Sequence, residues 1–426
     1  MLPVHQAEQL ILSLVHPFNP DHDVEVLDLL KACDRVLAAP IISQLDFPHW
    51  DNSAMDGYAV RFADVQTCRP DQPIELEIVE EIPAGYQPQH TIQPGQAARI
   101  LTGSVMPSGA DTVVMQEDTR RQDERVWILT TPKPQAFVRH QGEFYRAGAV
   151  LLPAGIMLGA PEIAVLAAAQ CASVKVYRRP RVAILSTGSE LVGVEQPLQA
   201  GQIVDSNQYA LAALVAQAGA EPLCLGRVPD EPDQLRAAIV HAITTADIVL
   251  SSGGVSVGDY DYVDDILEEL GADIAIRAVA MKPGKPLTVA TLSDRQFASS
   301  EPNPSPVSPT LYFGLPGNPV SALVTFWRLV LPALRKLSGL AQAWQPAFVD
   351  ARSRQVLRSD GKRETYLWGS VSLENGIYEF SPAGGNHSSG NLINLAQTNS
   401  LARLSVGQTQ IAVGETVQVV LTQSLV

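Results

Sequence analysis

Four segments carry glycines, hydroxyls or lysines in patterns that suit binding of a phosphorylated ligand. They are Ser186–Glu190 (STGSE), Ser251–Asp261 (SSGGVSVGDYD), Met281–Pro286 (MKPGKP) and Leu315–Ser321 (LPGNPVS). Phosphate oxygens need hydrogen-bond donors, which backbone N–H groups at a helix N-terminus, hydroxyls and ammonium groups supply. Each segment alone is ordinary, so the interpretation depends on whether the fold brings them together.

The first segment combines a tight turn with polar side chains. Gly188 permits the turn, Thr187 offers a hydroxyl to an anion, and Glu190 is able to accept a hydrogen bond from a donor ring. Thr-Gly turns are common, so this signal is weak by itself. Further along the same connection, the triplet Asp205–Asn207 precedes a helical pattern. Taken alone, it is best explained as a helix N-cap.

The second segment predicts a phosphate cradle, because three glycines and three serines lie between an apolar strand and a helix. No Gly-Lys-Ser/Thr follows, so it is not a Walker A loop, and it lacks the dinucleotide G-x-G-x-x-G pattern. Asp259 and Asp261 suggest Mg²⁺, a hard ion that prefers oxygen ligands. A simple preference of acidic residues for the first turn of a helix explains them equally well. The cradle residues are Ser252, Gly253, Gly254 and Ser256.

The third and fourth segments add cations and another helix N-terminus. Lys282 and Lys285 are separated by a Pro-Gly turn that limits where they point, which favours anion binding over a solvated turn. In the fourth segment Pro319 lies near the first helical position. A rigid connector or a second anion pocket would both fit that segment. The residues available there are Gly317, Asn318 and Ser321.

The surrounding pattern predicts a multidomain α/β plus β protein with a central, mainly parallel sheet. From Arg181 onward, apolar strands alternate with helices, which implies βαβ units, and ligands of such sheets bind at the carboxyl ends of the strands. Helices are expected over residues 4–15 and from Val24 to about Leu37, with Asp23 as N-cap. The expected domains are 1–50 with 139–178 (helical linking), 51–138 (inserted β), 179–338 (α/β) and 339–426 (C-terminal β-barrel). The Pro/Ser-rich stretch 293–310 is expected to be a surface insertion.

Composition bounds the class of protein. The 426 residues correspond to roughly three domains at about 150 residues each. A formal charge of −15 argues against a general nucleic-acid or anionic-membrane binder. The four cysteines are widely spaced and form no CxxC pair, so we expect no disulfide framework and a reducing, cytoplasmic location. We expect no signal peptide, because MLPVHQAEQL lacks a basic segment before an apolar core.

Taken in order, the four segments and the DSN triplet resemble the molybdopterin molybdenumtransferase (MoeA) family, whose relatives include the gephyrin E domain. FPHWDNSAMDGYAV (47–60) and RILTGSVMPSGADTVVMQED (99–118) resemble the family's N-terminal signatures, and SSGNLINLAQTNSLARL (388–404) a C-terminal one. The resemblance covers nearly the whole chain. DNSAMDGYA and SGGVSVGDYD are highly specific, and their joint presence makes an accidental match improbable.

The resemblance implies a homodimer in which the central α/β domain holds the pterin and the partner's MDGYA loop closes the cleft. It implies a Mg²⁺-assisted reaction in which molybdate and adenylylated molybdopterin give molybdenum cofactor and AMP. It also implies transient contact with molybdopterin adenylyltransferase and with recipient molybdoenzymes. The expected oxyanion and phosphate donors are Ser256, Lys282, Lys285, Ser321 and Arg363; Thr187, Glu190 and Asp205 face the pterin, Asp261 the ligand or Mg²⁺, and Asp56 and Ser389 come from the N-terminal and C-terminal domains.

Two departures from the family pattern are visible. The family's Arg-Gly-Glu-Asp stretch appears as Gln141–Phe144, so the usual aspartate is missing and Glu143 is the nearest substitute. Trp368 stands where family members often carry Arg, which predicts a weaker second anion contact in the C-terminal domain. Neither departure touches the central loops, so activity is expected to survive.

Two other functions compete with the transferase. A non-catalytic scaffold that presents a peptide-binding surface would tolerate loss of the charged residues, but Asp56, Asp261, Lys282 and Lys285 are all present. A molybdopterin adenylyltransferase would share the central α/β domain and would not require the MDGYA domain or the C-terminal barrel. Both of these appear in the sequence, which favours the molybdenum-inserting enzyme.

Overall fold

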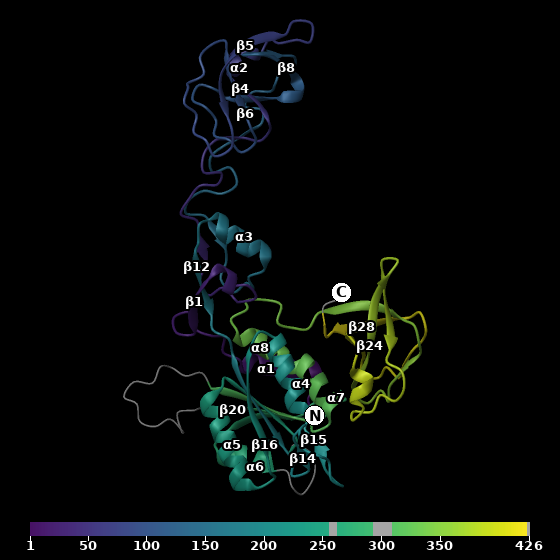
Figure 1. The fold of residues 1–426 in the computed structure, drawn as a ribbon. Coiled ribbons are helices and arrows are strands. Elements are labelled where there is room, and N and C mark those ends of the chain that lie inside the picture. The colour runs from purple at the N-terminus through teal and green to yellow at the C-terminus, as the bar shows by residue number, and fades with distance from the viewer. Residues whose placement is uncertain (255–261, 293–308, 424–426) are drawn as a thin grey trace, which may run out of the picture. The chain divides into compact units, whose positions relative to one another are not determined.

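The computed structural model describes residues 1–254, 262–292 and 309–423. These residues form two compact units, of which the first comprises Met1–Ala39, Ala154–Gly159 and Ser173–Val426 and the second Pro40–Pro153 and Ala160–Ala172. Figure 1 shows the elements of both units. No helix among the described residues is long and apolar enough to cross a bilayer.

A six-stranded sheet forms the centre of the first unit. Its first four strands run parallel, while β20 is antiparallel to both of its neighbours, so the predicted mainly parallel α/β domain is confirmed. The carboxyl ends of β13, β17 and β21 therefore meet at one edge. The strand order is β16 (Glu221–Val228), β13 (Arg181–Thr187), β17 (Ile248–Ser252), β21 (Thr310–Leu315), β20 (Pro286–Leu292) and β18 (Asp273–Ala278).

Helices cover both faces of this sheet, because its strands are apolar on both sides. Val182 and Ile184 of β13 join one core and the alternate residues Ala183 and Leu185 join the other, as a period of two requires. Figure 1 shows α5 and α6 apart from the group of helices on the opposite face. The helices are α1 (Val4–Leu14), α4 (Asn207–Gln217), α7 (Pro319–Thr325) and α8 (Leu331–Leu337) on one face, and α5 (Pro232–Thr245) and α6 (Tyr262–Glu269) on the other.

A π-helix, η4 (Phe326–Val330), connects α7 to α8 and buries a charge. The Arg328 guanidinium forms an ion pair with Glu8 of α1, and its Nε donates to the Tyr366 hydroxyl at 2.8 Å. Burial by itself lowers the pKa of this arginine, but Tyr366 and Glu8 more than offset that effect and raise it. The Tyr366 hydroxyl in turn donates to Glu364. This network ties the N-terminal helix and the C-terminal domain to the centre of the unit.

The expected helix from Val24 to Leu37 is wrong. Residues Val24–Asp28 form strand β1, which pairs antiparallel with β12 (Ser173–Tyr177) over five residue pairs, and Leu29–Lys31 (η1) make one 3₁₀ turn. The sequence VEVLD does not alternate strictly, since Val26 and Leu27 are adjacent, but the alternating SVKVY offers it a partner strand far along the chain. Tertiary pairing thus overrides a weak helical pattern. The helix expected over 4–15 is confirmed as α1.

The C-terminal domain is a closed barrel, as predicted. Its five strands pair in the order β24–β25–β22–β28–β26, and β26 pairs back with β24. A short strand of the central domain, β19 (Met281–Lys282), pairs with the start of β24. The barrel strands are β22 (Phe348–Ser353), β24 (Glu364–Glu374), β25 (Ile377–Pro382), β26 (Ser400–Leu404) and β28 (Thr416–Leu421), with β23 (Leu357–Arg358), β27 (Gln410–Ile411) and η5 (Leu392–Leu395) between them.

The second unit is built on another six-stranded sheet with its own apolar core, which includes Tyr58, Val114 and Ile128. Its order is β7 (Thr112–Met115), β4 (Gly57–Val60), β6 (Gln96–Ile100), β5 (Ile74–Ile82), β9 (Arg125–Ile128) and β8 (Thr119–Gln122). The remaining elements are β2 (Ile41–Ile42) with β11 (Val150–Leu152), β3 (Asn52–Ser53) with β10 (Val138–Arg139), and α2 (Phe62–Val65), η2 (Gln116–Asp118) and α3 (Ala160–Ala168). The MDGYA motif runs into β4.

Candidate functional site

The carboxyl ends of β13, β17 and β21 bring three of the four polar segments side by side. In the sheet register, Ser186 is opposite Ser252, and Ser252 is opposite Leu315. The hydroxyls of Ser186 and Ser252 are buried and lie 3.2 Å apart. Segments that are distant in sequence therefore share one edge of the sheet, which is the arrangement that the βαβ pattern predicted.

Gly253 and Gly254 form a tight crossing over the first segment. Their φ angles are +94° and +64°, a region that favours glycine, and a Cβ on either would lie 2.9 Å from Thr187 Oγ1. A Cβ on Gly317 would lie 3.6 Å from the Cα of Gly253. Three loops thus approach one another through backbone atoms. The Thr187 hydroxyl is buried and has no hydrogen-bond partner among the described residues.

The DSN triplet connects the start of α4 to the fourth segment. Asn207 Nδ2 donates to the carbonyl of Gly317 at 2.9 Å. Asp205 Oδ1 accepts the Gln208 N–H at 3.1 Å, so one carboxylate oxygen caps the helix. The other oxygen, Oδ2, is buried and lacks a partner within the described part of the chain. The helix cap therefore accounts for only one of the two carboxylate oxygens.

Glu190 is exposed at the end of the first segment. Gly188, at φ +150°, would place a Cβ 2.7 Å from Glu190 Oε2, so the glycine lets this carboxylate fold back over the turn. The Gly188 N–H donates to the carbonyl of Val228 at 3.3 Å.

The C-terminal domain reaches this region at two points. The Val320 N–H of α7 donates to the Ser389 carbonyl at 3.1 Å, which places Ser389 beside the fourth segment and next to buried Ser321. Asn318 is exposed at the start of α7. At the second point, Arg363 Nη1 donates to the Met281 carbonyl at 3.2 Å.

The two lysines of the third segment differ in their surroundings. Lys282 Nζ forms an ion pair with Asp360 Oδ2 of the barrel at 2.9 Å. The hydrogen bond from Lys282, followed by the Lys362 N–H and the charge of Arg363, holds the pKa of Asp360 below its ordinary value. Lys285 is exposed, and its carbonyl accepts the Val279 N–H at 3.0 Å. The sequence interpretation missed Asp360, because nothing in its local motif signals a lysine partner.

In the second unit, Asp56 is held by a residue that the sequence analysis did not select. Its Oδ1 accepts hydrogen bonds from the Thr102 N–H and the Thr102 hydroxyl, both at 2.7 Å. The backbone bond, the hydroxyl bond and the charge of Arg99 hold the pKa of this exposed carboxyl below its ordinary value. The signal available was the hydroxyl of the LTGS turn in the second N-terminal signature. Thr102 thus orients the Asp56 carboxylate through two bonds to one oxygen and favours its ionised form.

Ser256, Asp259 and Asp261 lie outside the described residues. Among the described residues, no group of three or more His, Cys, Asp and Glu side chains is arranged to hold a metal ion. The described residues alone therefore do not fit a metal site made only of protein ligands.

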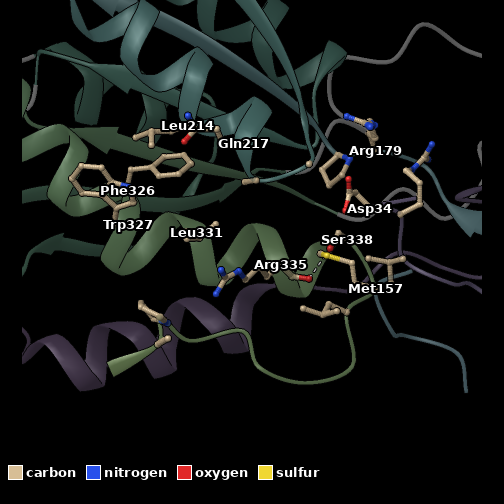
Figure 2. A pocket seen from close by; sticks show the side chains of 18 of the residues that line it. Asp34, Met157, Arg179, Leu214, Gln217, Phe326, Trp327, Leu331, Arg335 and Ser338 are labelled. Atoms are coloured by element: carbon tan, nitrogen blue, oxygen red, sulfur yellow. Dashed lines mark hydrogen bonds between the residues drawn. The ribbon is translucent and has the colours of Figure 1, made fainter. Parts of the chain in front are cut away.

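A hollow of about 890 Å³ lies elsewhere in the first unit and is lined by none of the predicted site residues (Figure 2). Phe326, Trp327 and Leu331 contribute its apolar wall. Two of the arginines that line it are engaged, because Arg178 is paired with Asp23 and Asp247, and Arg335 donates to the carbonyls of Trp344 and Gln345. Size alone does not make this hollow the site, and the converging loops are the stronger candidate.

Comparisons with known proteins agree with the choice of the converging loops as the candidate site. Family models match residues 2–169 (MoeA N-terminal region, domains I and II), 183–336 (probable molybdopterin binding domain) and 350–422 (MoeA C-terminal region, domain IV). A protein of Nostoc sp. (strain PCC 7120) named molybdopterin molybdenumtransferase is 62% identical over 98% of this chain and 93% of its own length. The protein of that name from Haemophilus influenzae is 37% identical over 90% of this chain and 88% of its own.

The chain belongs to the MoeA family of molybdenum cofactor biosynthesis enzymes. The fold agrees, since a crystal structure of the molybdopterin biosynthesis MoeA protein from Pyrococcus horikoshii OT3 superimposes with a TM-score of 0.82. The match covers 99% of this chain and 100% of that one at 29% identity.

The structure shows the surroundings of both departures from the MoeA pattern. Trp368 is buried in β24, and its ring lies 4.5 Å from that of His387, so it packs beneath the 383–391 loop and exposes no charge. Phe144 is 60% exposed and tilts against the ring of Phe47, with centroids 5.8 Å apart. Glu143 Oε2 accepts the His140 N–H at 3.0 Å, which leaves its other oxygen free of any hydrogen bond to a described residue.

Proposed function

We propose that this enzyme inserts molybdenum from molybdate into adenylylated molybdopterin, with release of AMP. The observation that carries the proposal is the convergence of the first, second and fourth segments, through Gly253, Thr187 and Gly317, at the edge where α/β sheets bind ligands. The curated relatives bear the name of this transferase.

In this proposal the chain's own residues bind and orient two anions. Thr187, Asp205 and Glu190 face the pterin. Backbone N–H groups of the 252–256 loop and the start of α7, with Ser321, Lys282, Lys285 and Arg363, face the phosphate and molybdate oxygens. Water cleaves the phosphoanhydride to give AMP and the pterin phosphate. The two dithiolene sulfurs bind molybdenum in place of a molybdate oxygen, which takes up the two thiol protons and leaves as water. This chemistry depends mainly on positioning and on neutralising charge.

Magnesium dependence is part of the proposal. Asp259 and Asp261 are the candidate ligands. Mg²⁺ would be bound by these carboxylates together with substrate phosphate oxygens, a combination that is common for this ion. When bound, the ion would neutralise phosphate charge. No step assigned to the protein side chains depends on it.

The proposal extends to assembly. We propose a homodimer in which the partner subunit's Asp56 reaches the cleft, a cytoplasmic location, and transient contact with molybdopterin adenylyltransferase and recipient molybdoenzymes. We also propose the domain division 1–50 with 139–178, 51–138, 179–338 and 339–426.

The test is incubation of the purified protein with adenylylated molybdopterin, Mg²⁺ and molybdate, with AMP followed by chromatography. We expect AMP release that requires molybdate and stops with chelator. Lys285→Ala and Asp261→Ala should each abolish cofactor synthesis while the dimer stays intact. Cofactor synthesis at the wild-type rate by Lys285→Ala protein would refute the role given to that lysine.

A further inference from the structure

Lys282, one of the proposed anion donors, already has a carboxylate against its ammonium group. Lys282 Nζ donates to Asp360 Oδ2 at 2.9 Å, and both side chains are partly exposed, at 45% and 35%. An anionic substrate group that approaches this ammonium therefore meets a negative charge that the protein itself supplies.

The position of the Asp360 carboxylate is set by its own turn. Its second oxygen, Oδ1, accepts the Lys362 N–H at 3.0 Å. The turn is anchored through Ser359, whose hydroxyl accepts the Gly361 N–H at 3.0 Å and donates to the Gln408 carbonyl at 2.7 Å. An ordinary surface ion pair must order two flexible side chains, which limits its contribution. Here one partner is already ordered by the backbone around it.

The backbone of Lys282 is also fixed relative to that turn. β19 pairs in parallel with β24, so that Lys282 is opposite Thr365. The Glu364 N–H donates to the Ala280 carbonyl at 3.0 Å, and Arg363 donates to Met281 on the same short strand. Only the lysine side chain is able to move away from Asp360. The ammonium group must therefore be shared between the carboxylate and any bound anion.

The charge of the ligand decides whether it displaces Asp360 from the Lys282 ammonium group. The barrel segment beside Lys282 carries two cations, Lys362 and Arg363, and two anions, of which Asp360 is paired with the lysine and Glu364 with the Tyr366 hydroxyl. A ligand group with one negative charge attracts the ammonium group no more strongly than the Asp360 carboxylate does. A phosphoanhydride or molybdate carries more charge and gains more from the ammonium group, although it is still repelled by the carboxylate.

We propose that Asp360 is the resident counter-ion of Lys282 and sets the charge that a ligand must carry to bind there, because every anion has to compete with this carboxylate for the ammonium group. The inference rests on the proposed function of this site. Asp360 acts through Lys282, so it sets the affinity of this position for anions and is not a catalytic residue.

The test compares Asp360→Asn with wild type in direct binding of inorganic pyrophosphate and of dimethyl phosphate, a monoanion, by titration calorimetry on the full-length protein. We expect Asp360→Asn to bind pyrophosphate about two- to fivefold more tightly at low salt, as loss of an exposed charge pair implies. Dimethyl phosphate should gain less, because its single charge meets less repulsion from the carboxylate, and both gains should shrink at high salt. Asp360→Glu, which keeps the charge, should behave like wild type.

Two controls make the result specific. Asp350→Asn removes an exposed carboxylate from β22 of the same barrel and should leave both affinities unchanged. In a Lys282→Ala background, Asp360→Asn should produce no gain. Weaker pyrophosphate binding by Asp360→Asn would overturn the counter-ion role in favour of one that orients the lysine, and an equal gain in Asp350→Asn would reduce the effect to net charge.

The outcomes separate this inference from the proposed function. If wild-type protein releases AMP but Asp360→Asn binds both anions as wild type does, only the counter-ion role falls. If wild-type protein releases no AMP but the gain appears and requires Lys282, the counter-ion role stands and the transferase assignment falls. Identical pyrophosphate binding by wild type, Lys282→Ala and Asp360→Asn would overturn the inference.

Discussion

Asn207 holds Gly317 across 110 residues of sequence, with its Nδ2 donating to the glycine carbonyl at 2.9 Å. The first of these residues begins α4 and the second precedes α7, so the bond fixes two helix N-termini relative to each other. Gly317 in turn lies against Gly253, and Gly253 lies against Thr187. The candidate binding edge is thus positioned by close contacts to the backbone of glycines, so that one added carbon atom would disturb it.

Replacement of Gly253 tests that sensitivity. Gly253→Ala should lower pyrophosphate affinity by more than about tenfold, since an added Cβ would collide with Thr187 and the residue would also be strained at φ +94°. The control is Gly219→Ala, at φ +81° with open space around it, which should cost about 1 kcal/mol of stability and leave affinity unchanged. Equal loss of affinity in both variants would contradict the close approach as the cause.

Thr102→Val tests the setting of Asp56. The substitution removes the hydroxyl bond but keeps the backbone bond, so the pKa of Asp56 should rise toward its ordinary value of 3.8 while remaining below it. The check is an NMR titration of the Asp56 carboxyl. A carboxyl whose pKa is lowered in the folded state stabilises the protein above pH 3.8, and this stabilisation is lost as the pH falls through the folded-state pKa. Because the variant has less of it to lose, the pH at which half of the protein is unfolded by acid should not decrease. An unchanged Asp56 pKa would show that the hydroxyl bond is unimportant.

The buried Arg328 network should couple strongly to stability. Arg328→Met leaves Glu8 without its cation, and removing one partner of a buried ion pair typically costs about 3–5 kcal/mol. Urea unfolding measures the loss. The double variant Arg328→Met/Glu8→Met should recover part of it, because no uncompensated charge remains. Additive losses would contradict the pairing.

His387 should give the folded protein a pH dependence on the acid side of neutrality. Burial lowers its pKa below the ordinary 6.5, so below about pH 6.5 the unfolded chain binds a proton that the folded chain does not. Stability should therefore fall as the pH decreases from 6.5 through the folded-state pKa. His387→Phe should flatten this slope in urea unfolding curves, whereas His16→Gln, at an exposed position, should keep it. A slope that survives His387→Phe would assign it to other groups.

The central elements were predictable because their signals are local and repeated. Apolar runs of strand length alternate with helical periodicity from Arg181 onward, and the polar segments follow the strands directly. Strand β1 was missed because five residues without strict alternation are a weak signal until their partner strand is known. Asp360 could not be found because Lys282 is 78 residues away. Trp368 was recognised as a departure, but its contact with His387 depends on barrel closure.

The pairing of β1 with β12 bears on the order of events during translation. Val24–Asp28 leave the ribosome long before Ser173–Tyr177, their partners in the sheet, have been made. Residues 40–153, the main part of the second unit, are complete by then and have a core of their own. Domains generally fold as units from the N-terminal side. We therefore expect residues 40–153 to fold first during synthesis. Residues 1–39 pack only later, when the remainder of the first unit has been made.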